Sequence, residues 1–347
     1  MRIPLTWLQD YVEIPAGESA ESIGEHLVRA GLEVEDIHTV GGPVVGPLVV
    51  GRVREVEELT DFKKPIRFCQ VEVGEGNGHP DTPGVRGIIC GATNFAAGDL
   101  VVVALPGTVL PGDFAIASRT TYGHVSDGMI CSEQELGLGG EHGGIIVLAP
   151  DAGSPGDEAR TILGMGETVI EVTVTPDIGY CLSLRGIGRE LATAYDVAFH
   201  DPGTELVGLP APDGTEPHPV EVADLAGAGL YTLRTITGFD PTAPTPAWMA
   251  RRLVAAGTRS ISLAVDVTNY VMLETGQPMH AFDLSKLDGP VTVRRSREGE
   301  TLETLDHVAR ELSTADLVIA DRRGPVGLAG VMGGLASEID DTTTDIA

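Results

Sequence analysis

The middle of the chain, from about residue 43 to residue 150, consists of short apolar runs separated by glycine, proline, asparagine and aspartate. The runs are LVVGRVREVEEL, IRFCQVEVG, GIICGA, DLVVVAL and GIIVLA. Each has the length and the β-branched content of a strand, and the residues between them favour turns. Five strands within roughly 110 residues predict a small β-barrel, of which the OB-fold is one form and the SH3-like barrel another.

The sequence before and after this region has mixed α/β character. Residues 1–40 predict a short strand, a helix that Ser19 caps and Gly31 ends, and a second strand. After Gly166 the run TVIEVTVTP predicts a strand, and residues 184–195 predict a helix in which charged and apolar positions interleave.

The last third of the chain predicts a second α/β region. Residues 200–219 are rich in proline, glycine and aspartate, which indicates a linker. Thr245 and Pro246 then open a helix that Gly257 ends. Strands are predicted at SLAVDVTNYVML, GPVTVRR and DLVIA.

Length and charge limit the classes of function. The 347 residues suffice for two or three domains with separate cores. Acidic residues number 51 against 23 basic ones, which gives a formal net charge of −28. Since affinity for phosphates depends on lysine and arginine, we expect no strong, nonspecific binding of nucleic acid by the whole surface. Any contact with RNA must be local.

The cysteines and the N-terminus indicate a reduced, cytoplasmic protein. Cys69, Cys90, Cys131 and Cys181 are far apart in the sequence and form no C-x-x-C pair, so neither a disulfide framework nor a zinc site is expected. The opening MRIPLTWLQDYVEI lacks the apolar run of a signal peptide. No apolar stretch reaches about 18 residues, the length that a membrane-spanning helix needs.

Four segments, in the same order, resemble the beta subunit of bacterial phenylalanyl-tRNA synthetase. They are RIPLTWLQDYVEI with RAGLEVE, then SDGMICSEQELGLG, VTPDIGYCLSLRGIGRELA and AVDVTNYVMLETGQPMHAFD. The last, at residues 264–283, is the most specific because it matches without a gap. The resemblance covers essentially the whole chain and identifies it with the N-terminal part of that subunit.

The resemblance implies an α+β multidomain protein in which an OB-fold barrel is inserted into a small α/β domain. Such an insertion is tolerated because its two ends lie close together. The expected parts are an N-terminal α/β domain at 1–40 and 155–200, an OB-fold tRNA-binding domain at 41–154, a linker at 201–219, and a B3/B4-type editing domain at 220–347 that is incomplete at its C-terminal end.

The family's function implies tRNA binding and hydrolytic editing of Tyr-tRNA(Phe). A hydrophobic pocket discriminates only about 10²-fold against an analogue with an added hydroxyl, so a second, hydrolytic site is needed. The implied partners are tRNA(Phe) and the alpha subunit, in a heterotetramer without a membrane. Aminoacylation is expected of the alpha subunit, with ATP and Mg²⁺ as cofactors of the complex, and no cofactor is expected in this chain.

The expected editing site contains polar residues and a glycine-rich stretch, with no metal. The resemblance implies His280 near the ester and the terminal adenosine, Asn269 and Thr268 as polar pocket residues, and Gly330, Gly333 and Gly334 around the amino-acid side chain. From the residues alone, His280 could equally be a structural histidine, Asn269 a turn residue after a strand and Thr268 a strand residue. The glycines could serve close packing of strands. A phosphate-binding loop is rejected because no Lys-Ser or Lys-Thr follows them.

The expected RNA contacts combine cations with aromatic rings, as in OB-folds that stack bases. They lie at Lys63, Lys64 and Arg67 beside Phe62, and at Arg119 and Tyr122. A solvated loop and a packed aromatic residue are the alternative interpretation.

The chain departs from the family pattern at several positions, including Ile178 in place of an arginine and Ser260 in place of a proline. We expect the chain to be a fragment or a shortened relative, because the family's further domains do not follow Ala347. Two alternative functions remain open at this point: a freestanding hydrolase that acts on misacylated tRNA, and a noncatalytic tRNA-binding or assembly module.

Overall fold

The computed structural model of the chain describes residues 1–60, 62, 65–79, 81–138, 144–204 and 218–347. It contains two compact units, which are described separately. The first unit comprises Met1–Asp177, Glu190–Val197 and Ala247–Gly257, and the second comprises Ile178–Arg189, Ala198–Pro246 and Thr258–Ala347.

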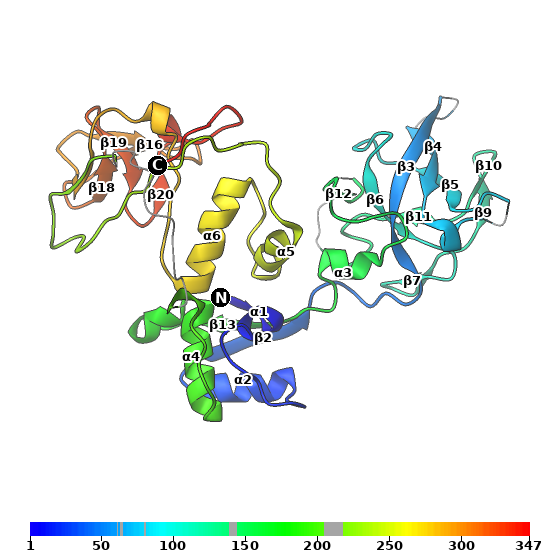
Figure 1. Cartoon of the computed structure of the whole chain (residues 1–347), viewed down its shortest axis with the longest axis horizontal. Coiled ribbons are helices and arrows are strands. Elements are labelled where there is room, and N and C mark those ends of the chain that lie inside the picture. Colours follow the sequence, from blue (N-terminus) through cyan, green and yellow to red (C-terminus); the bar gives the residue numbers. More distant parts are fainter. Residues whose placement is uncertain (61, 63–64, 80, 139–143, 205–217) are drawn as a thin grey trace. The chain divides into compact units, whose positions relative to one another are not determined.

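The first unit begins with a three-stranded antiparallel sheet in the order β1-β13-β2 (Figure 1). The strands are β1 (Arg2–Pro4), β2 (Glu33–Thr39) and β13 (Thr168–Thr173), and the helices α1 (Leu5–Leu8) and α2 (Ala20–Arg29) accompany them. The central strand β13 comes after residues 48–158 in the sequence, so residues distant in the sequence form one sheet.

The helix α2 forms where it is predicted. The Ser19 side chain accepts a hydrogen bond from the Ser22 backbone N–H at 3.2 Å, which satisfies one free donor of the first turn. Ile23 and Leu27, four positions apart, are buried against the sheet. Gly31 ends the segment with a φ of 97°, a conformation that favours glycine.

A larger sheet follows in the order β11-β6-β3-β4-β5, with β12 also paired to β6. The five predicted strands are confirmed. Asp127, just before β11, donates its backbone N–H to the Gly87 carbonyl of β5 at 2.8 Å, so the two ends of the sheet meet and the sheet curls. The bounds are β3 (Leu48–Leu59), β4 (Ile66–Glu72), β5 (Val85–Cys90), β6 (Leu100–Ala104), β11 (Met129–Ile130) and β12 (Val147–Leu148).

The strand β6 is buried on both faces. Val101 and Val103 belong to one apolar cluster, whereas Leu100 and Val102 belong to another, because successive side chains of a strand point to opposite faces. The remaining elements are the hairpins β7 (Val109–Leu110) with β8 (Phe114–Ala115) and β9 (Arg119–Thr121) with β10 (His124–Ser126), and the helix α3 (Ala159–Leu163).

The second unit contains a five-stranded sheet in the order β14-β15-β18-β19-β20, in which only β14 and β15 are parallel. The strands predicted at GPVTVRR and DLVIA are confirmed as β15 and β18. The bounds are β14 (Val220–Val222), β15 (Val291–Arg295), β18 (Leu317–Ala320), β19 (Pro325–Leu328) and β20 (Met332–Gly333), with a hairpin of β16 (Thr301–Glu303) and β17 (Ala309–Glu311).

The strand predicted at SLAVDVTNYVML is wrong, because this segment forms the helix α6 (Leu263–Thr275). The β-branched residues favoured a strand, but propensity is a weak signal that tertiary packing overrides. Asp266 and Tyr270, one helical turn apart, are both buried, and Gly276 ends the helix with a φ of 80°. Thr268 and Asn269 are therefore helical residues, and their interpretation as strand and turn residues is also wrong.

The other predicted helices are confirmed as α4 (Leu184–Tyr195) and α5 (Ala247–Ala255). The helix α5 packs in the first unit, where it contacts β1 and α3. Most of the predicted linker, at residues 205–217, lies outside the described residues.

The four cysteines are buried and form no disulfide. Burial raises the pKa of the Cys69 thiol to about 12, which makes it unreactive. Across the described residues, no helix has the length and apolar character to span a membrane.

Candidate functional site

His280 lies against Gly333 of β20. A Cβ atom added to Gly333 would lie closer than 3.0 Å to the His280 Cε1 and Nε2 atoms. The Phe282 ring meets the imidazole edge-on, with ring centroids 4.5 Å apart. Because Phe282 is 1% exposed, it fixes the imidazole from the core side. The glycine therefore makes room for the histidine ring.

The environment of His280 keeps its imidazole neutral. The residue is exposed along one side, yet the neighbouring protein removes enough water from the ring to lower its pKa from the ordinary value. A neutral imidazole offers one nitrogen as a hydrogen-bond acceptor and the other as a donor. Such a group can orient a water molecule near neutral pH.

The glycine-rich stretch forms the connection between β19 and β20. Gly327 and Gly333 are register partners, and Gly330 turns the chain with a φ of 72°. A Cβ atom on Gly334 would lie within 3.0 Å of Leu302 and of the Val326 backbone. The alternative interpretation of the glycines, that they allow strands to pack closely, therefore holds for Gly334.

Among the described residues, no hydrogen bond connects Thr268 or Asn269 to His280. Thr268 donates its hydroxyl to the Val265 carbonyl inside α6 at 2.7 Å. The structure thus joins His280 and Gly333, two of the predicted site residues, without joining the two helical ones to them.

Asp266 is an important residue that the sequence reasoning missed. Its side chain is 0% exposed and accepts hydrogen bonds from Thr245 Oγ1 and Ser260 Oγ, both at 2.5 Å, and from the Ile261 N–H at 2.9 Å. Thr245 precedes α5 in the sequence and Ser260 follows it, so one carboxylate joins two segments of the second unit that are separate in the sequence. An acidic residue inside the apolar run LAVDVTNYV was the available signal.

Among the predicted RNA-binding residues, Lys63 and Lys64 lie outside the described residues. Arg67 is held within the fold. It donates to Glu58 at 2.8 Å and to the Phe95 carbonyl at 2.9 Å, and its side chain is only 15% exposed. Its guanidinium is therefore largely used by the protein.

Arg119 and Tyr122 lie on the exposed β9–β10 hairpin. Tyr122 is 42% exposed and meets the Phe62 ring edge-on, with centroids 4.7 Å apart. The Arg119 guanidinium lies 5.9 Å from the centroid of the exposed Phe114 ring. Exposed rings beside a cation have the chemistry of a base-stacking surface.

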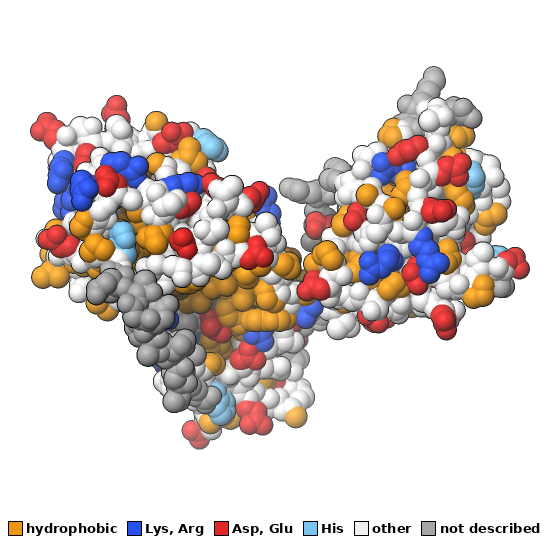
Figure 2. All heavy atoms as spheres, turned by 45° about the horizontal axis from the view of Figure 1, so that its top comes forward, with side chains coloured by type: hydrophobic (Ala, Val, Ile, Leu, Met, Phe, Trp, Pro, Cys, Tyr) orange, Lys and Arg blue, Asp and Glu red, His pale blue; other side chains and the backbone are white. Residues whose placement is uncertain are grey.

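Basic side chains elsewhere are mostly paired with carboxylates. On the face that Figure 2 shows, acidic side chains are spread widely and basic ones lie among them. In the second unit Arg294 pairs with Glu300 at 2.7 Å, and Arg295 pairs with Asp224 at 2.6 Å. These arginines compensate local negative charge and do not form a free basic surface.

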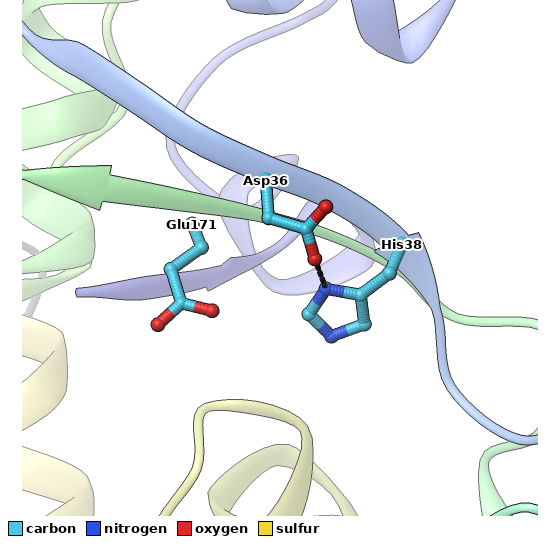
Figure 3. A group of neighbouring side chains, drawn as sticks. All are labelled: Asp36, His38 and Glu171. Carbon is cyan, nitrogen blue, oxygen red and sulfur yellow. Dashed lines mark hydrogen bonds and ion pairs between the residues drawn. The ribbon is translucent and has the colours of Figure 1, made fainter.

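One group of described residues has the side-chain types of a metal site. Asp36, His38 and Glu171 lie on the paired strands β2 and β13, with ligand atoms within 4.8 Å of one another (Figure 3). His38 already bonds to Asp36 at 3.0 Å, and Arg2 pairs with Glu171 at 3.3 Å. Because these side chains already bind one another and Arg2, the cluster is explained as a network of surface side chains without a metal ion.

Two family models match the chain. Residues 48–158 match the "Putative tRNA binding domain", which contains the curled sheet. Residues 227–347 match the "B3/4 domain", which contains His280 and Gly333.

The chain is similar over its whole length to curated proteins named "Phenylalanine--tRNA ligase beta subunit". It is 57% identical to the one from Thermobifida fusca (strain YX) and 54% identical to the one from Streptomyces avermitilis, with 100% of this chain and 41% of each relative covered. The chain thus spans about 41% of the length of these relatives.

Among solved structures, an N-terminal fragment of the phenylalanyl-tRNA synthetase beta subunit from Pyrococcus horikoshii matches with a TM-score of 0.28 and 10% identity, over 52% of this chain and 55% of that chain. A likeness this distant carries no argument about fold or function.

Proposed function

We propose a function from the premise that this chain belongs to the family of phenylalanine–tRNA ligase beta subunits. It contributes tRNA binding and the hydrolysis of Tyr-tRNA(Phe) to the ligase complex. The observation that carries the proposal is the contact of His280 with Gly333 inside the segment that matches the B3/4 domain.

The proposed reaction is hydrolysis of the aminoacyl ester by water. Water adds to the ester carbonyl, the bond from that carbon to the ribose oxygen breaks, and a proton from the water passes to this oxygen, which becomes the ribose hydroxyl. The products are tyrosine and tRNA. The ester is already activated, so no covalent nucleophile is required, and the protein's main task is to position the water.

His280 orients this water in the proposed site through its neutral imidazole. Gly330, whose added Cβ would meet no atom within 4 Å, leaves space for the tyrosyl ring. Gly333 makes room for the His280 ring, and Gly334 supports both by close packing. Thr268 and Asn269 remain proposed polar groups, which would reach the substrate from α6. Donors facing the developing oxyanion would stabilise the transition state.

The barrel region is proposed to bind the tRNA locally. We propose the OB-fold arrangement for the curled sheet, because the two ends of the sheet meet at Asp127 and Gly87. Arg119 and Tyr122 would contact RNA, and Lys63 and Lys64 would add positive charge. Arg67 would act mainly by holding the neighbouring strands.

The proposed domain limits remain 1–40 with 155–200, 41–154 and 220–347. The proposed partner is an alpha subunit, and ATP and Mg²⁺ would serve aminoacylation by the complex in the cytoplasm. The chain's own residues would bind and edit the charged tRNA.

A single-turnover deacylation assay tests the proposal. The chain is mixed with Tyr-tRNA(Phe) or Phe-tRNA(Phe), with and without an alpha subunit. We expect faster hydrolysis of the tyrosyl ester, and its loss in His280→Ala. Equal rates for both esters would contradict editing. Binding of tRNA without any hydrolysis would instead support the noncatalytic module, and hydrolysis that is independent of the alpha subunit would support a freestanding hydrolase.

A further inference from the structure

We infer a second ligand site, for a nucleotide, in a cavity of the first unit. The cavity lies between α5, the start of α1 and the end of α3, and has a volume of about 390 Å³. Ligand pockets for small molecules span about 300–1,000 Å³. The residues that carry the argument are Thr6, Gly164, Glu167, Trp248, Arg251 and Arg252.

Arg251 supplies a positive charge that the protein leaves largely unused. Its aliphatic stem packs on Gly164, where an added Cβ would lie 3.3 Å from Arg251 Cδ. Its hydrogen bond to the Ile162 carbonyl is 3.5 Å long, at the limit for such a bond. In the described part of the chain, Arg251 forms no ion pair. Its planar guanidinium can therefore bind a phosphate through two parallel hydrogen bonds.

The other charged groups of the cavity are already satisfied. Arg252 pairs with Asp10 at 2.7 Å, and its guanidinium lies 5.5 Å from the Trp7 ring centroid and 5.9 Å from the Trp248 ring centroid, which leaves the opposite face of Trp248 for a ligand. Glu167 accepts hydrogen bonds at both carboxylate oxygens, from the Thr6 backbone N–H at 3.0 Å and from the Thr6 hydroxyl. Two arginines and one glutamate line the cavity, so the charge of its lining is positive, and Arg251 is the arginine of the two that has no ion pair among the described residues. The cavity therefore favours an anion over an amine or a zwitterionic amino acid.

Trp248 indicates that the ligand also has a flat ring. Its side chain is 47% exposed on the same helix as Arg251, three positions earlier. Residues three apart on a helix lie on one face. A phosphate that reaches Arg251 can therefore carry a nucleobase onto the Trp248 indole, as in other sites that stack bases on aromatic rings. The ligand belongs to one chemical class: a nucleoside phosphate, either free or at the end of an RNA strand.

This site is independent of the proposed editing, since His280 belongs to the other unit. Tryptophan fluorescence provides the test, because the chain has 2 tryptophans and Trp7 is 0% exposed. We expect AMP to quench the Trp248 emission saturably. Adenosine and inorganic phosphate should each bind at least roughly tenfold more weakly, because each lacks one of the two contacts.

Arg251→Gln should weaken AMP binding roughly tenfold or more, measured by calorimetry, with an unchanged melting temperature. Arg234→Gln, which changes an exposed arginine of the second unit, is the matched control and should bind AMP as the parent chain does. A 5′-phosphorylated RNA tetramer identifies the source. Tighter binding than AMP supports an RNA end, and similar binding supports a free nucleotide. No saturable response to either probe, or equal affinity for adenosine and AMP, would overturn the inference.

Discussion

The His280 imidazole occupies the space that a side chain at residue 333 would need, since an added Cβ on Gly333 would lie within 3.0 Å of two ring atoms. The position of the histidine thus depends on the absence of a side chain in β20. This relationship connects a titratable group to a glycine-rich turn, and both belong to the segment that matches the B3/4 domain. It makes the proposed site sensitive to a single methyl group.

Gly333→Ala should therefore displace His280 and reduce hydrolysis of Tyr-tRNA(Phe) by roughly 10²-fold, the scale of a lost acid–base or water-orienting group. The matched control is Gly327→Ala. Gly327 pairs with Gly333 across the hairpin, but its added Cβ would meet no atom closer than 3.7 Å. Single-turnover rates and melting temperatures are measured for both variants. Equal losses of activity would show that the turn, and not the histidine, is responsible.

The lowered pKa of His280 predicts a pH dependence of stability. Above the ordinary histidine pKa of about 6.5, the imidazole is neutral in the folded and the unfolded chain and adds no pH dependence. As the pH falls from there towards the lower folded pKa, the unfolded chain binds a proton that the folded chain does not. The free energy of unfolding should therefore decrease in this window. An NMR titration of the His280 Cε1–H signal, assigned with His280→Gln, should give a midpoint below 6.5. A midpoint at or above this value would contradict the prediction.

Local patterns predicted most elements because their signals act over a few residues. Ser19 and Gly31 define α2 through a cap and a positive φ, and both depend on nearby backbone groups. The segment of α6 shows the limit of this reasoning. Its β-branched residues favour a strand in isolation, whereas the buried carboxylate of Asp266 and the burial of Tyr270 depend on segments elsewhere in the chain.

The candidate site was predictable only through the family resemblance. No spacing rule connects His280 to Gly333, since their contact depends on how the chain after α6 meets β20. Arg67 illustrates the converse. The sequence shows a cation near an aromatic residue, but only the fold shows that Glu58 and the Phe95 carbonyl use its donors.

Asp266→Ala should destabilise the second unit by about 3 kcal/mol, because hydrogen bonds to a buried charged acceptor are worth about 1.5–3 kcal/mol each and do not add fully. The loss would separate the segments around Thr245 and Ser260, which the Asp266 carboxylate joins within the second unit. Thr245→Val removes one of these bonds and should cost about 1 kcal/mol. Asp240→Ala is the control, since the side chain of this exposed aspartate accepts its hydrogen bonds from nearby Thr242. Chemical denaturation followed by circular dichroism measures all three. A similar change for Asp266→Ala and Asp240→Ala would refute the anchoring role.

The β9–β10 hairpin should contribute to tRNA affinity through two separable effects. Arg119→Gln should weaken binding several-fold and reduce the slope of log K against log salt by about 1, because one cation is lost. Tyr122→Ala should weaken binding by a similar factor without changing the slope, because stacking releases no counterion. Tyr180→Ala, at a tyrosine that is 48% exposed in the second unit, serves as the control. Filter binding at several salt concentrations measures each constant, and unchanged affinity in both hairpin variants would exclude this surface.

The buried ion pair between Arg86 and Asp127 should stabilise the curled sheet. Their side chains are 15% and 8% exposed, and Arg86 also donates to the carbonyls of Asn77 and Gly78. Removing one partner leaves an uncompensated charge in a site with little water, so Arg86→Met or Asp127→Asn should each cost about 3–5 kcal/mol.

The double variant Arg86→Met with Asp127→Asn should cost clearly less than the sum of the two single changes, because neither charge is then left alone. The comparison pair is Glu25 with Arg29 on α2, whose side chains are 69% and 65% exposed. Removing either of these should cost less than about 0.5 kcal/mol, since water screens the pair. Chemical denaturation of the four single variants and the two double variants gives a double-mutant cycle for each ion pair. If the free-energy costs of the Arg86 and Asp127 changes are additive, the ion pair does not stabilise the sheet. The backbone hydrogen bond between Asp127 and Gly87 would then hold the two ends of the sheet together without the ion pair.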